Sequence, residues 1–331
     1  MTMYLHGLGH FHPENEITNQ FLTDLDIGTN AEWIEERTGI LSRRTVMSLD
    51  YIKETRNRDL TLVPDARMYS HAETGKRASE MALKRAGLEA ADIGLVIAGG
   101  CNPEYLSPAD ACTIAAAMGM EVPAFDVNSA CTSYHVALYT LSMMRPEALP
   151  DFVLVVTPET VTTTVDYSDR AAAVLWGDGT TAAVISTRVP SRVRIMGNTL
   201  ESSPAGFDKV TIGNNDHFVQ EGRTVQMFAI KKTSRVLRAL QKEYAEPGRS
   251  LHFVGHQANF NMLQAVCRQC DIPDDRHHHS VVNFGNTGAA GAPGVMSMRW
   301  DEWKDGDDVA VVGVGSGLTW SGHVYRFGDA S

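Results

Sequence analysis

The stretch from Val122 to Met144 reads VPAFDVNSACTSYHVALYTLSMM and contains three local patterns in succession. An apolar run to Val127 predicts a buried strand, small residues then indicate a turn, and the run from Tyr134 predicts an amphipathic helix. Cys131 therefore stands at or near a helix N-terminus. There the helix dipole and unpaired backbone N–H groups favour the nucleophilic thiolate. A buried structural cysteine is the competing interpretation of a lone cysteine at this position.

Strand-like and helix-like runs alternate on both sides of this stretch, which predicts a layered α/β fold. We expect two similar halves, residues 1–185 and 186–331, with the nucleophilic cysteine in the first half. The predicted strands span residues 94–98, 124–127, 152–156, 181–185, 251–254 and 309–314. The other predicted helices span residues 72–86, 109–118, 231–244, 258–270 and 288–300.

Length and composition narrow the class of protein. With 331 residues, the chain exceeds the size at which a single core usually stops growing, and 43% hydrophobic and 21% charged residues are typical of a globular protein. A net charge of −11 argues against nucleic-acid binding, which needs a basic surface. Five cysteines without framework spacing favour a reducing compartment. We see no signal peptide or membrane span and expect a cytoplasmic protein.

Three further polar clusters follow predicted strands or turns. His256 lies in Gly-His-Gln-Ala-Asn, directly after a predicted strand, where α/β proteins commonly place catalytic groups. Asn286 lies in Gly-Asn-Thr-Gly, and residues 313–320 read GVGSGLTW, a run that lets backbone approach a ligand closely. Each cluster alone has an ordinary structural explanation, as a satisfied histidine or a tight turn.

Taken together and in this order, the motifs at 131, 256, 286 and 313–320 resemble those of the 3-oxoacyl-(acyl-carrier-protein) synthase III family. These are condensing enzymes of the thiolase superfamily. The resemblance extends from about residue 4 to residue 327, with segment 47–70 longer than the usual pattern. Further similar segments are residues 32–40 with Arg43 and Arg44, and residues 168–170 with 176–179.

The resemblance implies a five-layered αβαβα sandwich of two similar halves, assembled as a homodimer. It implies a catalytic triad of Cys131, His256 and Asn286, with an oxyanion hole formed by the backbone N–H groups of Cys131 and Ser316. Neither a metal nor a cofactor is expected, since the substrates themselves are the acyl-CoA and the malonyl thioester.

The implied reaction is a decarboxylative Claisen condensation of an acyl-CoA primer with a malonyl-carrier protein through an acyl-Cys131 intermediate. Such a reaction serves fatty acid or secondary-metabolite biosynthesis. One alternative is an acyltransferase that passes the acyl group to an oxygen, nitrogen or aromatic acceptor without condensation. Another is a degenerate structural subunit of a heteromeric synthase, although an intact triad argues against it. A papain-like protease is disfavoured, because its local cysteine motif and fold pattern differ.

Binding residues also follow from the resemblance. Trp33 and Arg37 match positions that contact the adenine end of coenzyme A, whereas Thr163 stands where better-known members have a second arginine. A cationic strip on a predicted helix, together with one retained cation of the family's docking patch, is the candidate surface for an acidic carrier protein. A solvated helix face is the competing interpretation. These cations are Lys231, Arg235, Arg238 and, from the patch, Arg268.

The primer pocket is expected to differ from that of short-chain members. Those members close the acyl channel with a phenylalanine from the partner subunit. The matching position here is Ser107, or Leu106 if the loop slips by one residue. Loss of a phenyl ring would open the pocket, so we expect a preference for medium-chain acyl-CoA over acetyl-CoA.

Three other features have no assigned role in this scheme. Segment 47–70 is either a site-covering loop or a solvated excursion with a short helix. The run His277–His279 is read as solvated rather than metal-binding. Cys267 and Cys270 are read as core or helix-face residues.

Overall fold

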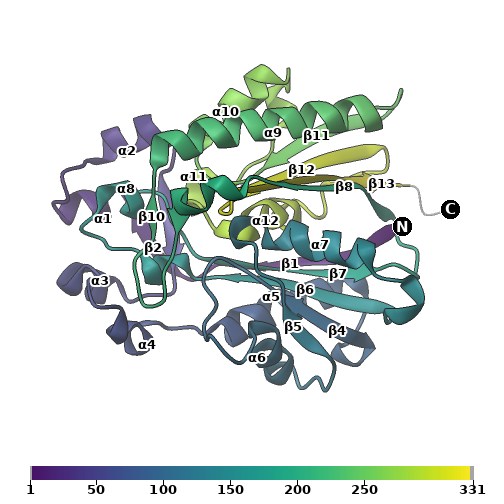
Figure 1. Cartoon of the computed structure of the whole chain (residues 1–331), viewed down its shortest axis with the longest axis horizontal. Helices are drawn as coiled ribbons and strands as arrows, with labels where there is room; N and C mark the ends of the chain where they lie inside the picture. Colours follow the sequence, from purple (N-terminus) through teal and green to yellow (C-terminus); the bar gives the residue numbers. More distant parts are fainter. Residues whose placement is uncertain (1, 329–331) are drawn as a thin grey trace.

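The computed structural model describes residues 2–328, which fold into five alternating layers of helix and sheet (Figure 1). Three of the layers are helical and are built from α5 (His71–Ala86), α6 (Asp110–Ala117), α7 (Ser133–Met143), α9 (Gly222–Tyr244), α10 (Phe260–Gln269) and α12 (Gly291–Met298). Helices α7 and α12 form the central layer, α5 and α6 cover the N-terminal strands, and α9 and α10 cover the C-terminal strands. The predicted αβαβα sandwich is confirmed.

Nine strands form one continuous hydrogen-bonded sheet. The sheet consists of two half-sheets that meet where β8 pairs with β1. The strands are β1 (Met3–Phe11), β4 (Ile93–Ala98), β5 (Ala124–Asp126), β6 (Phe152–Glu159), β7 (Gly179–Ser186), β8 (Val193–Ser202), β11 (Ser250–Gly255), β12 (Asp307–Gly315) and β13 (Thr319–Phe327). The order is β11-β12-β13-β8-β1-β7-β6-β4-β5. β1 and β8 pair through Met3 with Ile195 and Tyr4 with Arg194. This short contact links two half-sheets that face each other across α7 and α12.

Shorter elements surround one end of the layers, on the side where the two half-sheets present the ends of β5, β11 and β12. They include two small hairpins, β2 (Asn15–Thr18) with β3 (Ser42–Thr45) and β9 (Val210–Thr211) with β10 (Val219–Gln220). The remaining helices are α1 (Asn19–Asp24), α2 (Ala31–Thr38), α3 (Leu49–Thr55), α4 (Val63–Ala66), α8 (Arg170–Ala173) and α11 (Val281–Phe284). Figure 1 shows α1, α2, α3 and α8 gathered at this end, far from both termini.

The central helices are apolar around most of their circumference, as burial on both sides requires. Every residue of α12 from Gly291 to Ser297 is buried. In α7 the buried set includes Tyr134, Ala137, Leu138 and Leu141, which join one core with side chains of both half-sheets. Burial between two sheets holds both helices rigidly, and the N-terminal ends of both helices reach the same region.

Glycines in β1 let α5 pack directly on the sheet. A Cβ at Gly9 would lie 1.9 Å from the carbonyl oxygen of Ala78, and one at Gly7 would lie 2.2 Å from that of Ala82. Helix α5 has alanines at the facing positions, Ala78 and Ala82, so the backbone of the helix packs directly against the backbone of β1. Any larger residue at Gly7 or Gly9 would force the outer layer off the sheet.

Several sequence predictions are confirmed and others fall short. The helix predicted over residues 72–86 is α5, which ends at Gly87 in the left-handed conformation. Each predicted strand is present. By contrast, β1, β8 and β13 were not predicted, because glycine, histidine and other polar residues interrupt their apolar pattern. Helix α9 begins at Gly222, well before the predicted start at Lys231.

Segment 47–70 folds as short helices rather than as an open loop. Helices α3 and α4 flank a turn in which Asn57 is buried and its Nδ2 donates to the carbonyl oxygens of Thr163 and Val165, at 2.9 and 3.0 Å. The segment thus packs on the polypeptide that follows β6. In residues 2–328, no helix is both long and apolar enough to cross a membrane.

A buried histidine pair lies in the central layer. His135 of α7 and His323 of β13 approach to 3.3 Å between their Nδ1 atoms, and both are almost wholly inaccessible to solvent. The hydroxyls of Tyr134 and Tyr325 are hydrogen-bonded beside them. Burial, with the nearby His256 adding to it, lowers the pKa of His135 to about 3, and burial lowers the pKa of His323 well below its usual value. Both rings are therefore neutral in the folded protein.

We predict that this pair makes the fold sensitive to acid. Unfolded histidines take up protons near pH 6.5, while the folded pair does not, so stability falls as the pH drops below about 6.5. For each such histidine, the free energy of unfolding falls by about 1.4 kcal/mol for every pH unit below about 6.5. Urea unfolding between about pH 7.5 and 5.5 should show a weaker pH dependence for His135→Gln than for the unmodified protein. An equal pH dependence in both proteins would contradict the prediction.

Candidate functional site

Cys131 lies in a tight turn between β5 and α7. Residues 130–132 form one turn of 3-10 helix that leads directly into α7, and Ala130 has a positive φ of 47°. The Oγ of Ser133 accepts from the backbone N–H of Ser129 at 2.9 Å and donates to the carbonyl of Ala130 at 2.7 Å. The small residues of the sequence motif therefore form the turn that places the Cys131 side chain in the cavity wall, at the start of a buried helix.

His256 follows β11 directly, as the sequence predicted. Its backbone N–H donates to the carbonyl of Val312 at 2.8 Å, which extends the parallel pairing with β12 by one residue. The neighbouring Gln257 is buried, and its Oε1 accepts from the backbone N–H groups of Ser280 and Val281 at 2.8 and 3.1 Å. These bonds hold the backbone on both sides of His256.

Asn286 is oriented by its own turn. Its Oδ1 accepts from the backbone N–H of Gly288 at 3.1 Å. Its backbone N–H donates to the carbonyl of Leu175, and its carbonyl accepts from Gly177, at 2.8 and 3.0 Å. Because the amide oxygen is engaged, Nδ2 is the group left to donate into the cavity that Asn286 lines.

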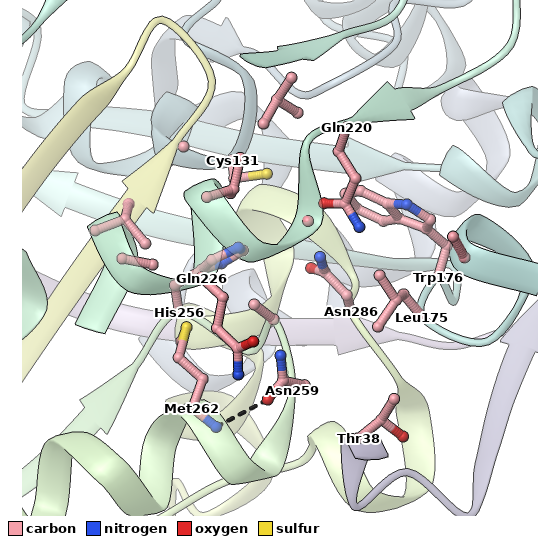
Figure 2. A pocket seen from close by; sticks show the side chains of 18 of the residues that line it. Thr38, Cys131, Leu175, Trp176, Gln220, Gln226, His256, Asn259, Met262 and Asn286 are labelled. Carbon is pink, nitrogen blue, oxygen red and sulfur yellow. Dashed lines mark hydrogen bonds between the residues drawn. The ribbon is translucent and has the colours of Figure 1, made fainter. Parts of the chain in front are cut away.

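The predicted triad converges on one cavity of about 240 Å³. Figure 2 shows Cys131, His256 and Asn286 lining it from three separate elements, with Trp176 and Gln220 nearby. All three triad residues are at least nine-tenths buried. Trp33 and Arg37 of α2 line the same cavity. Because Ser316 also lines it, the structure brings six sequence-predicted residues to one cavity.

The glycine-rich turn packs against the backbone of Cys131. A Cβ at Gly315 would lie 3.1 Å from the backbone nitrogen of Thr132 and 3.3 Å from that of Cys131. Ser316 follows and lines the cavity beside Cys131. The absence of a side chain at position 315 thus allows the two backbone segments predicted to form the oxyanion hole to lie together.

A second cavity, of about 330 Å³, meets the first at Cys131. The two share a wall formed by Cys131, Trp176, Val210, Phe218 and Ser316. The second cavity is further lined by apolar side chains, among them Pro103, Phe207 and Ile212. Cys131 therefore lies between the cavity that His256 and Asn286 line and a second cavity that they do not line. This second cavity was not predicted from the sequence, because hairpin β9–β10 and its flanks carry no recognisable motif.

A second thiol lies beside the nucleophile. The Sγ of Cys101 is 3.5 Å from the Sγ of Cys131, and Cys101 was not identified from the sequence. This hydrogen bond is the largest of the effects that hold the pKa of Cys131 well below its usual value, and His256 lowers that pKa further. The pKa of Cys101 is correspondingly raised well above its usual value. The arrangement is a Cys131 thiolate that accepts from a Cys101 thiol.

Glu159, at the end of β6, connects the backbone of Cys101 to the turn that follows Asn286. Its carboxylate accepts from the N–H of Cys101 at 3.1 and 3.0 Å and from the N–H of Ala289 at 2.7 Å. Burial raises the pKa of Glu159 to about 8. A positional signal could have found Cys101: it comes just after a buried strand, as Cys131 does. Glu159 carried no such signal, because its partners are backbone groups distant in sequence.

Aromatic and cationic groups meet at the outer end of the first cavity. Arg37 lies 6.0 Å from the ring centre of Trp33, and Arg170 of α8 lies 5.0 Å from the same ring. Arg170 also donates to the carbonyl of Gly28. Thr163, which replaces the expected second arginine, is buried. Arg170 was not predicted as part of this group.

Ser107 and Leu106 lie outside both cavities of their own chain. They belong to the exposed loop that links β4 to α6, and the side chain of Leu106 is 84% exposed. The loop is anchored behind them by Glu104, whose carboxylate accepts from the N–H of His71 at 2.7 Å and pairs with Arg67. Their assignment to an acyl pocket depends on a partner subunit and stays a prediction.

The four predicted docking cations are all exposed. Lys231, Arg235 and Arg238 lie on the outer face of α9, opposite the buried Leu237 and Leu240. Arg235 pairs with Glu201 at 3.1 Å, Arg238 donates to the carbonyl of Gln269, and Arg268 lies in the last turn of α10. The start of α9 lines the mouth of the first cavity. The strip begins at Lys231, two residues beyond Ala229, the last residue of α9 that lines the cavity.

Two other groups contain residue types that commonly bind metals. His71, Glu104 and Asp110 lie close together, but both ring nitrogens of His71 are engaged, with Asp110 at 2.9 Å and Thr160 at 2.8 Å. The run His277–His279 is not the solvated segment expected: His278 is buried, with its Nε2 2.8 Å from the Nδ1 of His252. The run is partly buried because His278 stacks on His252 and His277 stacks on Phe253, two residues of β11. Cys267 and Cys270 are buried, as expected.

Known proteins resemble the chain over its whole length. A family model described as 3-oxoacyl-(acyl-carrier-protein) synthase III matches residues 125–204, and one for the C terminal part of that enzyme matches residues 240–327. The beta-ketoacyl-(acyl-carrier-protein) synthase III of Oceanobacillus iheyensis is 31% identical and covers 99% of this chain and 100% of its own. That of Helicobacter pylori is 30% identical, with 96% of each chain covered.

Solved structures agree with the sequence relatives. The 3-oxoacyl-(acyl-carrier-protein) synthase III of Aquifex aeolicus superposes with a TM-score of 0.86 at 27% identity and covers 98% of this chain and 100% of its own. A priming beta-ketosynthase of the R1128 polyketide pathway has a TM-score of 0.84 at 24% identity, covering 99% and 97%. That second likeness concerns the fold alone.

We predict that Cys131 reacts as a thiolate near neutral pH. Its alkylation by iodoacetamide, followed by mass spectrometry of the Cys131 peptide, should reach half its maximal rate below about pH 8.5, the ordinary thiol pKa. Cys101→Ala removes the strongest stabilising contact and should raise this midpoint. Cys101→Ser keeps a hydroxyl donor and should raise it less. A midpoint unchanged in Cys101→Ala would show that the neighbouring thiol does not stabilise the thiolate.

Proposed function

This chain belongs to the 3-oxoacyl-(acyl-carrier-protein) synthase III family of acyltransferases, and on that premise we propose that it condenses an acyl-CoA primer with a malonyl thioester. The observation that carries the proposal is the convergence of Cys131, His256 and Asn286 on one cavity that also reaches Trp33 and Arg37. The proposed product is a 3-oxoacyl thioester for fatty acid or secondary-metabolite biosynthesis. The reaction requires no cofactor besides its substrates.

The first step is acylation of Cys131. The thiolate attacks the thioester carbonyl of the primer, a carbon–sulfur bond forms, and the coenzyme A thiolate leaves. The tetrahedral oxyanion needs donors that are already in place, and the backbone N–H groups of Cys131 and Ser316 are the candidates. Their support is the close packing of Gly315 on the Cys131 backbone. The low pKa of Cys131 favours this step, since the nucleophile is present in its reactive form.

The second step is loss of carbon dioxide from the malonyl group. His256 and the Nδ2 of Asn286 donate to the malonyl thioester oxygen while the bond to the carboxylate breaks. The electron pair moves into an enolate, whose carbon attacks the acyl-Cys131 carbonyl. A new carbon–carbon bond forms, and the thiolate of Cys131 leaves in its original state. An amide and a histidine suit this role because a carboxylate would repel the enolate.

Substrate recognition is proposed at the mouth of the first cavity. Trp33 and Arg37 would bind the adenine end of coenzyme A at the cavity mouth, and Arg170, stacked on Trp33, adds a cation that the Thr163 position lacks. The exposed cations of α9 and α10 would attract an acidic carrier protein to the same entrance. The position of the strip on α9, whose first turns line the same cavity, supports this assignment.

We propose a homodimer in which the loop carrying Leu106 and Ser107 reaches the partner's acyl cavity. An apolar side chain as exposed as Leu106, on a loop firmly anchored through Glu104, is typical of an interface residue. We also propose halves at 1–185 and 186–331, since the chain passes from one half-sheet to the other between β7 and β8. Five free cysteines suit a reducing compartment, and we propose the cytoplasm.

Replacing individual triad residues should separate the two steps. After incubation with acyl-CoA, His256→Ala and Asn286→Ala should still show the acyl adduct on Cys131 by intact mass. Formation of the 3-oxo product from malonyl-carrier protein or malonyl-CoA should fall by about 100-fold or more, because each variant lacks an enolate donor. Cys131→Ala should show neither adduct nor product.

Asn214→Ala, at an exposed asparagine that lines neither cavity, is the matched control and should form adduct and product normally. In the unmodified protein, an adduct without any 3-oxo product would favour transfer to another acceptor. Failure to form any adduct would favour a structural subunit. If His256→Ala or Asn286→Ala lost acylation more severely than decarboxylation, the proposed assignment of these two residues to the decarboxylation step would be wrong.

The apolar second cavity should select longer primers. Burial of each additional methylene is worth about 0.8 kcal/mol, or about fourfold in kcat/KM, until the cavity is full. We therefore expect kcat/KM to rise from acetyl-CoA to medium-chain acyl-CoA. Ile212→Trp, within the cavity wall, should shift the preference toward acetyl-CoA, whereas Val219→Trp, at an exposed position of β10, should not. Equal or better turnover of acetyl-CoA by the unmodified protein would refute this expectation.

A further inference from the structure

The pairing of β4 with β5 places two thiols at the same edge of the sheet. These strands are parallel neighbours, with Ala98 opposite Asp126, so the segments that follow them leave the sheet side by side. Cys101 is in one segment and Cys131 in the other. Their sulfur atoms lie 3.5 Å apart and both residues line the second cavity. In the proposed condensation Cys101 stabilises the Cys131 thiolate but forms no bond to a substrate.

Both members of the pair are held in place. The backbone of Cys101 is fixed by two hydrogen bonds to the Glu159 carboxylate, and that of Cys131 by the turn at the start of α7. A disulfide has a sulfur–sulfur bond of about 2.05 Å, so closure requires the two sulfur atoms to approach by about 1.5 Å. Rotations of the two side chains could supply part of that movement without displacing either strand. The other three cysteines do not line this cavity: Cys112 is exposed, Cys267 is buried in α10, and Cys270 is buried directly after that helix.

We propose that Cys101 is a resolving thiol that converts oxidised Cys131 into a reversible Cys101–Cys131 disulfide. A peroxide is the oxidant. The Cys131 thiolate attacks one peroxide oxygen, the oxygen–oxygen bond breaks, and Cys131 becomes a sulfenic acid while hydroxide or an alkoxide leaves. The Cys101 sulfur then attacks the sulfenic sulfur, the sulfur–sulfur bond forms, and the hydroxyl leaves as water with the Cys101 proton. A dithiol reductant restores both thiols.

This chemistry fits the surroundings of the pair. Two cavities meet at Cys131, so a small oxidant can reach it although the side chain is largely buried. The features that make Cys131 a good nucleophile toward a thioester also make it sensitive to peroxide. Without a resolving thiol, further oxidation would reach the sulfinic acid, which common reductants do not reverse. A neighbouring thiol within van der Waals contact intercepts the sulfenic acid first.

The test is treatment of the full-length protein with hydrogen peroxide, followed by non-reducing intact mass and peptide mapping. The unmodified protein should lose about 2 Da per chain, with a cross-linked peptide pair containing Cys101 and Cys131. Its condensing activity should be lost and then recovered after a dithiol reductant. Cys101→Ser should instead gain about 32 Da at Cys131, and reductant should not restore its activity.

Cys112→Ser, at the exposed cysteine, is the matched control and should behave as the unmodified protein does. Two results would overturn the proposal: sulfinic acid at Cys131 of the unmodified protein at the same rate as in Cys101→Ser, or a disulfide that joins any other pair. Because mass and cross-linking are read without substrate, these results do not depend on which acyl group or acceptor the enzyme uses.

Discussion

The burial of α7 between the two half-sheets is the constraint on which the site depends. Its apolar side chains join both sheets in one core, so the helix cannot shift without opening that core. Cys131 is attached to the first turn of this helix through a turn of small residues. The nucleophile is therefore held at a fixed point between halves that each bring their own polar groups to it.

Two kinds of contact then tune the sulfur. Backbone packing at Gly315 brings the turn after β12 against Cys131, where the proposed oxyanion hole would lie. The thiol of Cys101 and the ring of His256 favour the thiolate against the cost of burial. The same proximity that lowers the pKa of Cys131 supplies a second sulfur within reach of an oxidised one. Reactivity and its protection thus have one structural origin, the parallel pairing of β4 and β5.

Both halves of the chain contribute side chains to each of the two cavities that meet at Cys131. The triad side is formed by turns whose side chains are oriented through backbone hydrogen bonds, as Asn286 is through Gly288. The opposite side is lined by residues around hairpin β9–β10, many of them apolar. Under the proposed function, polar contacts would orient the reacting groups, and the volume of this second cavity would select the primer.

Local pattern in the sequence was sufficient for much of this protein. Alternating apolar runs predicted α5 and strands such as β4 and β6, and short motifs identified Cys131, His256, Asn286 and the turn around Ser316, since turns and helix starts are encoded by neighbouring residues. The tertiary structure alone decided the position of β1, whose glycines make sense only against α5, and the proximity of Cys101 and Glu159 to the nucleophile. Those contacts join segments from 30 to 130 residues apart in the chain, and no local pattern records which segments will meet.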